Sequence, residues 1–149
     1  MKFGTAVSST HELAPYLRSR LDALSNAYQN SITATDPNRI TGSVDIDTAL
    51  QLACANDYRW DYAIGYRINN QDDKAFFVEF HKANVDEVER VLRKKQWLES
   101  WMRGKPVDNL SPRRFVWVGT GGIKIPPNSP QRRILSTHGL QLVPRLNLR

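Results

Sequence analysis

Two short segments decide the fold: RWDYAIGY, residues 59–66, and FVEFH, residues 77–81. Both are rich in aromatic and β-branched residues and are bounded by polar turn residues, a pattern typical of short strands. Because side chains alternate along a strand, Glu79 and His81 share one face of the second strand. If the strands are neighbours, Asp61 converges with them. Carboxylates on a sheet face need a partner, and a divalent cation or an arginine would serve.

The surrounding residues predict the rest of the fold. The polar turn 69–73 joins two strands, at about 60–68 and 75–82, as a hairpin. The longest helix is expected from about Asp86 to Met102, followed by a strand at 114–119, a helix from Ser129-Pro130 and a last strand within 140–148. This order predicts an α/β protein in which a mixed central β-sheet is flanked by helices, an α/β/α sandwich.

The first 46 residues are expected to form an N-terminal helix and a polar loop. Apolar residues spaced by three and four form a stripe from Leu13 to Tyr28, although Pro15 disfavours an uninterrupted helix. Residues 30–42 are polar and are the expected mobile loop. Asp47 is the expected N-cap of a short helix over about 48–55. A chain of 149 residues is expected to form one domain, 1–149, with its main core in 47–149.

Composition narrows the function classes. Cys54 is the single cysteine, which excludes an internal disulfide. No window approaches the roughly 20 apolar residues of a membrane span, so no membrane partner is expected and the cytoplasm is the default location. Residues 1–75 carry 7 basic and 9 acidic residues, whereas residues 76–149 carry 14 and 6. This asymmetry favours contact between one basic surface and a polyanion such as DNA or RNA.

Several basic and aromatic residues are candidates for that contact. On the long helix, Trp97 and Trp101 flank basic residues, an arrangement suited to phosphate contact and base stacking, or equally to packing over the next loop. Paired arginines occur twice, and they also suit an ordinary solvated surface. The candidate nucleic-acid-binding residues are Arg90, Lys94, Trp97, Arg113, Arg114, Arg132 and Arg133.

An acidic residue on one strand, Glu-x-His on the next strand and then a helix resembles the layout of the PD-(D/E)XK nuclease-like (restriction endonuclease-like) superfamily, which includes many small bacterial proteins. The resemblance covers roughly residues 47–119. It implies a restriction endonuclease-like sandwich in which Asp61 and Glu79 hold Mg²⁺ or Mn²⁺.

Two departures from the family pattern matter. The family usually has a strand before the one that carries the aspartate, and only residues 56–59 are available for it here. His81 stands where the family usually has a lysine, and histidine can act as a base near neutral pH. Lys95 lies on the apolar face of the long helix, where it either reaches the site beside Glu79 as a catalytic group or packs its stem on the rim.

The sequence therefore predicts a nucleic-acid-binding protein, with metal-dependent phosphodiester hydrolysis as the enzymatic hypothesis. The alternative is a non-catalytic nucleic-acid-binding or protein-interaction module, for example a partner protein in a toxin–antitoxin or defence operon. The sequence leaves open DNA or RNA, and whether several copies of the chain assemble.

Overall fold

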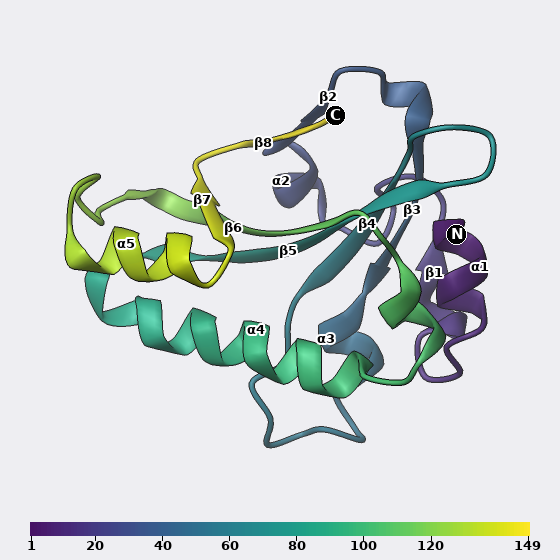
Figure 1. Cartoon of the computed structure of the whole chain (residues 1–149), viewed down its shortest axis with the longest axis horizontal. Coiled ribbons are helices and arrows are strands. Elements are labelled where there is room, and N and C mark those ends of the chain that lie inside the picture. The colour runs from purple at the N-terminus through teal and green to yellow at the C-terminus, as the bar shows by residue number, and fades with distance from the viewer.

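The computed structural model describes all residues, 1–149, and confirms an α/β protein with a mixed central sheet of six strands flanked by helices (Figure 1). The strand order in the sheet is β1-β3-β4-β5-β6-β7, and a two-stranded sheet pairs β2 with β8. The strands are β1 Leu17–Arg18, β2 Ile32–Ala34, β3 Ile40–Asp45, β4 Tyr62–Arg67, β5 Asp73–Ala83, β6 Arg113–Ile123, β7 Leu140–Val143 and β8 Leu146–Leu148. The helices are α1 Phe3–Ser8, α2 Asn26–Gln29, α3 Ile46–Ala49, α4 Val88–Met102 and α5 Pro130–Thr137.

The sheet is antiparallel in its first half and parallel in its second. β3, β4 and β5 pair antiparallel in succession, and the predicted hairpin is β4–β5. Helix α4 then crosses over the sheet, so that β6 lies parallel to β5, and α5 does the same between β6 and the parallel β7. A parallel pair needs such a crossover connection, which the predicted helices supply.

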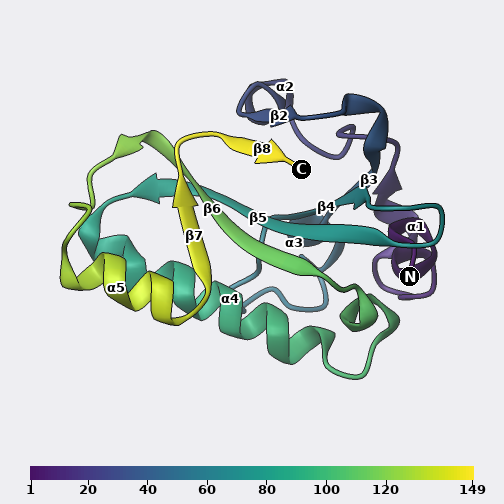
Figure 2. The same ribbon diagram turned by 45° about the horizontal axis from the view of Figure 1, so that its top comes forward.

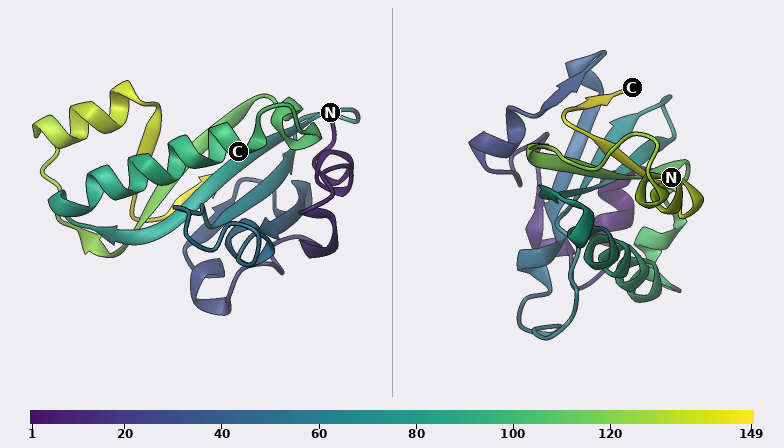
Figure 3. Two further views of the ribbon diagram at one scale, coloured as in Figure 1. Left: turned by 90° about the horizontal axis from the view of Figure 1, so that it is seen from below. Right: turned by 90° about the vertical axis from the view of Figure 1, so that its left-hand side faces the viewer.

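Different layers cover the two faces of the sheet. On one face, the larger core of 24 buried residues packs against α1 and α4. On the opposite face, a smaller core of 13 buried residues packs under the β2–β8 sheet and the segment around α2. Figures 2 and 3 show α4 and α5 on one side and β2 with β8 on the other. None of the helices has both the length and the apolar character of a membrane-spanning segment.

The long helix forms where the sequence predicts it. Its buried residues are Val88, Val91, Leu98 and Met102, at the three- and four-residue spacing of one helix face. The single turn 85–87 precedes it, and Gly104 follows it at a φ of 78°, a left-handed conformation that glycine adopts without strain. Helix α5 also begins as predicted, with the side chain of Ser129 as its N-cap.

The predicted N-terminal helix is wrong. The apolar stripe belongs to two separate cores, because Leu13 lies in the larger one and Leu24 in the smaller one. Pro15 lies in a single 3₁₀ turn, Ala14–Tyr16, and Arg20 has a φ of 49°, which no right-handed helix allows. The helices in this region are α1, over residues 3–8, and the single turn α2, over residues 26–29.

The expected mobile loop over residues 30–42 is also wrong, because it contains β2 and the beginning of β3. Ile32 and Ile40 are each only 8% exposed, so they anchor these strands. The short helix after β3 is α3, which ends at Ala49 and is capped by Asp45, whose Oδ1 accepts a 2.9 Å hydrogen bond from Thr48 N. Residues 1–46 thus supply two strands of the central sheet, β1 and β3.

Candidate functional site

Asp61 and Glu79 lie side by side where β4 begins. The antiparallel register pairs Tyr62 with Val78, so Asp61 is opposite Glu79 at the next step. Each carboxylate accepts a hydrogen bond from the backbone of the other strand: Asp61 N donates to Glu79 Oε1 at 3.1 Å, and Phe80 N donates to Asp61 Oδ2 at 2.9 Å. At the open end of the β4–β5 hairpin, these two side-chain hydrogen bonds therefore replace the backbone hydrogen bonds that would otherwise join the strands.

Glu79 is fully buried, and its counter-charge comes from α4. The exposed fraction of the Glu79 side chain is 0%, and Lys94 Nζ forms an ion pair with its Oε2. The Lys94 side chain is itself only 18% exposed. Burying a carboxylate is costly unless a hydrogen-bonded cation pairs with it, and Lys94 meets that requirement.

Of the two alternatives for Lys95, the structure does not show the one at Glu79, since Lys94 occupies that place. Lys95 Nζ instead lies 3.0 Å from Glu99 Oε1 and 4.5 Å from the centre of the Phe115 ring. Helical spacing could not separate the two lysines. Lys94 stands three residues after Val91 and four before Leu98, and Lys95 stands three before Leu98, so both lie near the apolar stripe.

His81 extends the cluster toward the solvent. Its Nδ1 lies 3.6 Å from Glu79 Oε2, and its Nε2 lies 3.1 Å from Glu87 Oε2. The carboxylate of Glu79, and then that of Glu87, raises the pKa of His81 above its ordinary value, while partial burial opposes them. In turn His81, followed by Lys82, lowers the pKa of Glu87. The shift favours the imidazolium form relative to a free histidine, which suits a proton donor or an anion contact better than a base.

The ionisation of Asp61 is strongly perturbed. Burial raises its pKa from 3.8 to about 7, and the charge of Glu79 adds to the effect. Lys94 and the hydrogen bond from Phe80 N act in the opposite direction. Two carboxylates thus share one lysine in a poorly hydrated place, and the second negative charge is incompletely compensated.

A pocket of about 330 Å³ reaches Lys94 from the surface. Its wall includes Arg59, which bonds Asp47 Oδ1 at 2.9 Å and the main-chain oxygens of Cys54 and Ala55. These contacts tie the loop between α3 and β4 into place. The pocket is lined by Asp47, Asn56, Asp57, Tyr58, Arg59, Arg90 and Lys94.

The donor set can be tested against the divalent ion that the resemblance implies. No group of three or more His, Cys, Asp or Glu side chains lies arranged to hold a metal ion. Mg²⁺ usually takes only one or two carboxylates and completes its octahedron with water and substrate phosphates. No protein group donates to Oδ1 of Asp61, and the uncompensated charge next to Glu79 favours a cation. Two carboxylates are the donor types that a hard ion such as Mg²⁺ or Mn²⁺ accepts, and both oxygens of Glu79 already contact Asp61 N and Lys94 Nζ.

Of the other sequence candidates, only Arg90 lies next to this cluster. Arg90 Nε is 3.4 Å from Glu87 Oε2, whereas Trp97 stacks on Trp101 with 6.3 Å between ring centres and packs against the larger core. Arg113 pairs with Asp108 at 3.0 Å. The remaining candidates, whose guanidinium groups have no acidic partner, are Arg114, Arg132 and Arg133.

Sequence reasoning missed Glu87 and the Asp47–Arg59 pair. Glu87 follows the strand by four residues at an irregular turn, so no periodic pattern connects it with His81. No family model, curated protein or solved structure matches this chain.

Proposed function

We propose that this chain is a nucleic-acid-binding domain of the PD-(D/E)XK type that hydrolyses phosphodiester bonds with Mg²⁺ or Mn²⁺. One observation carries the proposal. At the open end of the β4–β5 hairpin, Asp61 and Glu79 each accept a hydrogen bond from the backbone of the other strand, and Lys94 from the following helix contacts Glu79. A buried carboxylate pair with one cation, beside a surface pocket, is a frequent signature of a functional site.

The order of strands supports the same proposal. The strand that the family usually has before the aspartate is present as β3, which pairs antiparallel with β4. The helix that follows the Glu-x-His strand is α4, and the next strand, β6, lies parallel to β5. β3 thus stands where the sequence showed no strand, and it supports a restriction endonuclease-like arrangement of these strands, whereas the second face of the sheet is covered mainly by β2 and β8 and not by a layer of helices.

Lys94 can supply the ammonium group that is missing from the Glu-x-His motif. In the family a lysine two residues after the glutamate positions or activates the attacking water, and His81 stands there in this chain. Lys94 brings an ammonium group to the same carboxylate from α4. In this proposal Lys94 orients the water, and His81, whose raised pKa favours its charged form, contacts the phosphate or protonates the leaving oxygen.

Asp61 and Glu79 would hold the ion. When bound, the ion would lower the pKa of a water and neutralise charge on the scissile phosphate. The backbone hydrogen bonds from Asp61 N and Phe80 N keep both carboxylates in place before anything binds. The chain itself thus provides orientation, and the surrounding burial strengthens each charge interaction.

The experiment is a cleavage assay on plasmid DNA and on a single-stranded RNA, with Mg²⁺, Mn²⁺ or EDTA. Asp61→Asn, Glu79→Gln and Lys94→Met should each lower the cleavage rate at least a hundredfold. Lys95→Met is the matched control, because it removes the neighbouring lysine, which contacts Glu99, and it should cleave like the parent. Cleavage that persists in EDTA, or survives Glu79→Gln, would remove this site from the reaction.

A second candidate is the non-catalytic nucleic-acid-binding module. The complete burial of Glu79 and its pairing with Lys94 favour it, because such a pair can serve stability alone. This candidate is supported if the folded protein binds both nucleic acids but cleaves neither with any of the ions.

A further inference from the structure

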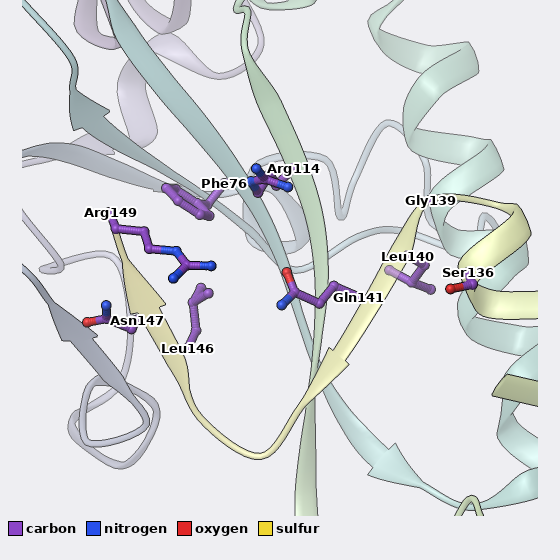
Figure 4. A pocket seen from close by; sticks show the side chains of 9 residues that line it. All are labelled: Phe76, Arg114, Ser136, Gly139, Leu140, Gln141, Leu146, Asn147 and Arg149. Atoms are coloured by element: carbon purple, nitrogen blue, oxygen red, sulfur yellow. The ribbon is translucent and has the colours of Figure 1, made fainter. Parts of the chain in front are cut away.

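A second concave site lies on the opposite side of the central sheet from α4. It occupies the angle between β7 and β8, and β5 and β6 form its floor (Figure 4). Phe76 and Arg114 are paired in the β5–β6 register, and Gln141 pairs with Val116, so all three point to this face. The volume of the pocket is about 520 Å³, within the range of small-molecule sites.

The pocket exists because the layer over this face ends there. Leu146 and Leu148 of β8 lie in the smaller core, whereas β6 and β7 extend beyond that cover. At the uncovered positions the floor carries Arg114 and Gln141, both exposed, in place of apolar residues. Figure 4 shows the side chains of Arg149 and Gln141 directed from opposite walls toward the open centre.

The charged side chains that line this pocket are both positive, Arg114 and Arg149. Neither Arg114 nor Arg149 lies within ion-pair distance of any acidic group. Lys74 Nζ donates to the main-chain oxygen of Arg149 at 2.8 Å and lies 5.6 Å from the centre of the Phe76 ring. Burial, followed by the charges of Arg114 and Arg149, lowers the pKa of Lys74. These three cationic side chains, with no acidic side chain in an ion pair with them, favour an anion in the pocket.

The rest of the neighbourhood offers no acid either. Residues 109–149 contain seven Lys or Arg residues and no Asp or Glu. A second hollow of about 360 Å³ shares Ser136, Leu140 and Gln141 with the pocket and is lined by Arg132 and Arg133. The two hollows together form a basic track along β7.

We propose that this pocket binds a phosphate group, carried by a free nucleotide or by a nucleic-acid backbone, between Arg114 and Arg149. Guanidinium groups match phosphate oxygens in planar, two-pronged hydrogen bonds, and a phosphate brings the negative charge that the pocket lacks. Gln141, Asn147 and Ser136 line the same space and supply neutral hydrogen-bonding groups. The basic track would carry the neighbouring phosphates of a longer strand. The site is separate from Glu79 and independent of the proposed hydrolysis.

The test uses two probes in EDTA: inorganic phosphate, followed by amide chemical shifts, and a labelled 12-nucleotide oligothymidylate, followed by fluorescence anisotropy. The test variant is Arg114→Gln with Arg149→Gln. The control is Arg67→Gln with Arg103→Gln, which removes the same charge from two exposed arginines that also lack acidic partners. Both pairs are on the surface, so folding should be unaffected.

The test variant should bind phosphate at least tenfold more weakly than the parent, and the control should stay within twofold. If the source is a nucleic-acid backbone, oligothymidylate binding should weaken too, and the magnitude of its salt slope should fall by about 1.4, since each phosphate contact on a single strand contributes about 0.7. If the source is a free nucleotide, only phosphate binding changes. No binding of either probe, or equal losses in both double variants, overturns the proposal. The Glu79→Gln variant should bind both probes like the parent, which separates this result from failure of the proposed hydrolysis.

Discussion

Replacing Lys94 by methionine tests the buried ion pair directly. The change keeps most of the volume of the side chain but leaves the carboxylate of Glu79, which is 0% exposed, without its cation. Removing one partner of a buried pair costs about 3–5 kcal/mol, because the other charge remains buried and uncompensated. Against a total stability of roughly 5–15 kcal/mol for a domain, this is a large loss. Urea unfolding followed by fluorescence measures it, because Trp60 and Trp117 are both fully buried.

The double variant Glu79→Gln with Lys94→Met separates lost charge pairing from lost packing. The glutamine can still accept the hydrogen bond from Asp61 N, and no unpaired charge remains at position 79. We expect the double variant to recover at least half of the loss, whereas Lys95→Met should cost less than about 1 kcal/mol because its partner Glu99 is half-exposed. If Lys94→Met unfolds at the parent urea concentration, or if the double variant is as unstable as the single one, the ion pair does not hold the site together.

Three further predictions use the neighbouring residues. The pKa of Asp61 is about 7 in the folded protein, against an ordinary value of 3.8, so its contribution to stability is full below about pH 4 and is lost as pH rises through 7. Asp61→Asn should remove this loss and raise the free energy of unfolding at pH 8 by as much as about 4 kcal/mol. Urea titrations at pH 5 and 8 measure it. Mn²⁺ at ten times its Kd should stabilise the parent by about 1.4 kcal/mol at pH 8, less at pH 5.5, and not at all in Asp61→Asn; equal stabilisation of that variant would place the ion elsewhere. Gly65→Ala should lower the free energy of unfolding by roughly 1–3 kcal/mol in urea titrations, because a Cβ there would lie 2.5 Å from Phe3 Cβ. Gly4→Ala, with open space around it, should stabilise α1 slightly in the same titrations.

The middle of the chain could be predicted from sequence because its patterns are strong. The sequences of β4 and β5 contain continuous or alternating apolar residues, and the apolar residues of α4 keep helical spacing over four turns. The same patterns predicted that Asp61 and Glu79 share one end of a hairpin, and the structure brings them together. These patterns could not predict how α4 is rotated about its own axis, and that rotation decides whether Lys94 or Lys95 contacts Glu79.

The N-terminal third could not be predicted because long-range contacts determine it. Strand β3 contains Gly42 and Ser43, both buried, and its sequence is typical of a polar loop. Gly42 is buried because Phe3 and Leu17 cover it, and Ser43 Oγ accepts a hydrogen bond from Ala23 N. Partners 20 or more residues away thus make a strand from residues whose local preferences indicate a turn.

The crossed hydrogen bonds between the two carboxylates and the hairpin backbone link chemistry to strand pairing. Asp61 Oδ2 and Glu79 Oε1 are the acceptors for the amides of Phe80 and Asp61, so a proton or a cation that draws on either carboxylate weakens the acceptor of a backbone amide. Opening of this end of the sheet then follows the charge state of the site. Hydrogen exchange at these two amides would thus report occupancy of the cluster without any substrate. A ligand bound there would also change the exchange rates of neighbouring amides in β4 and β5.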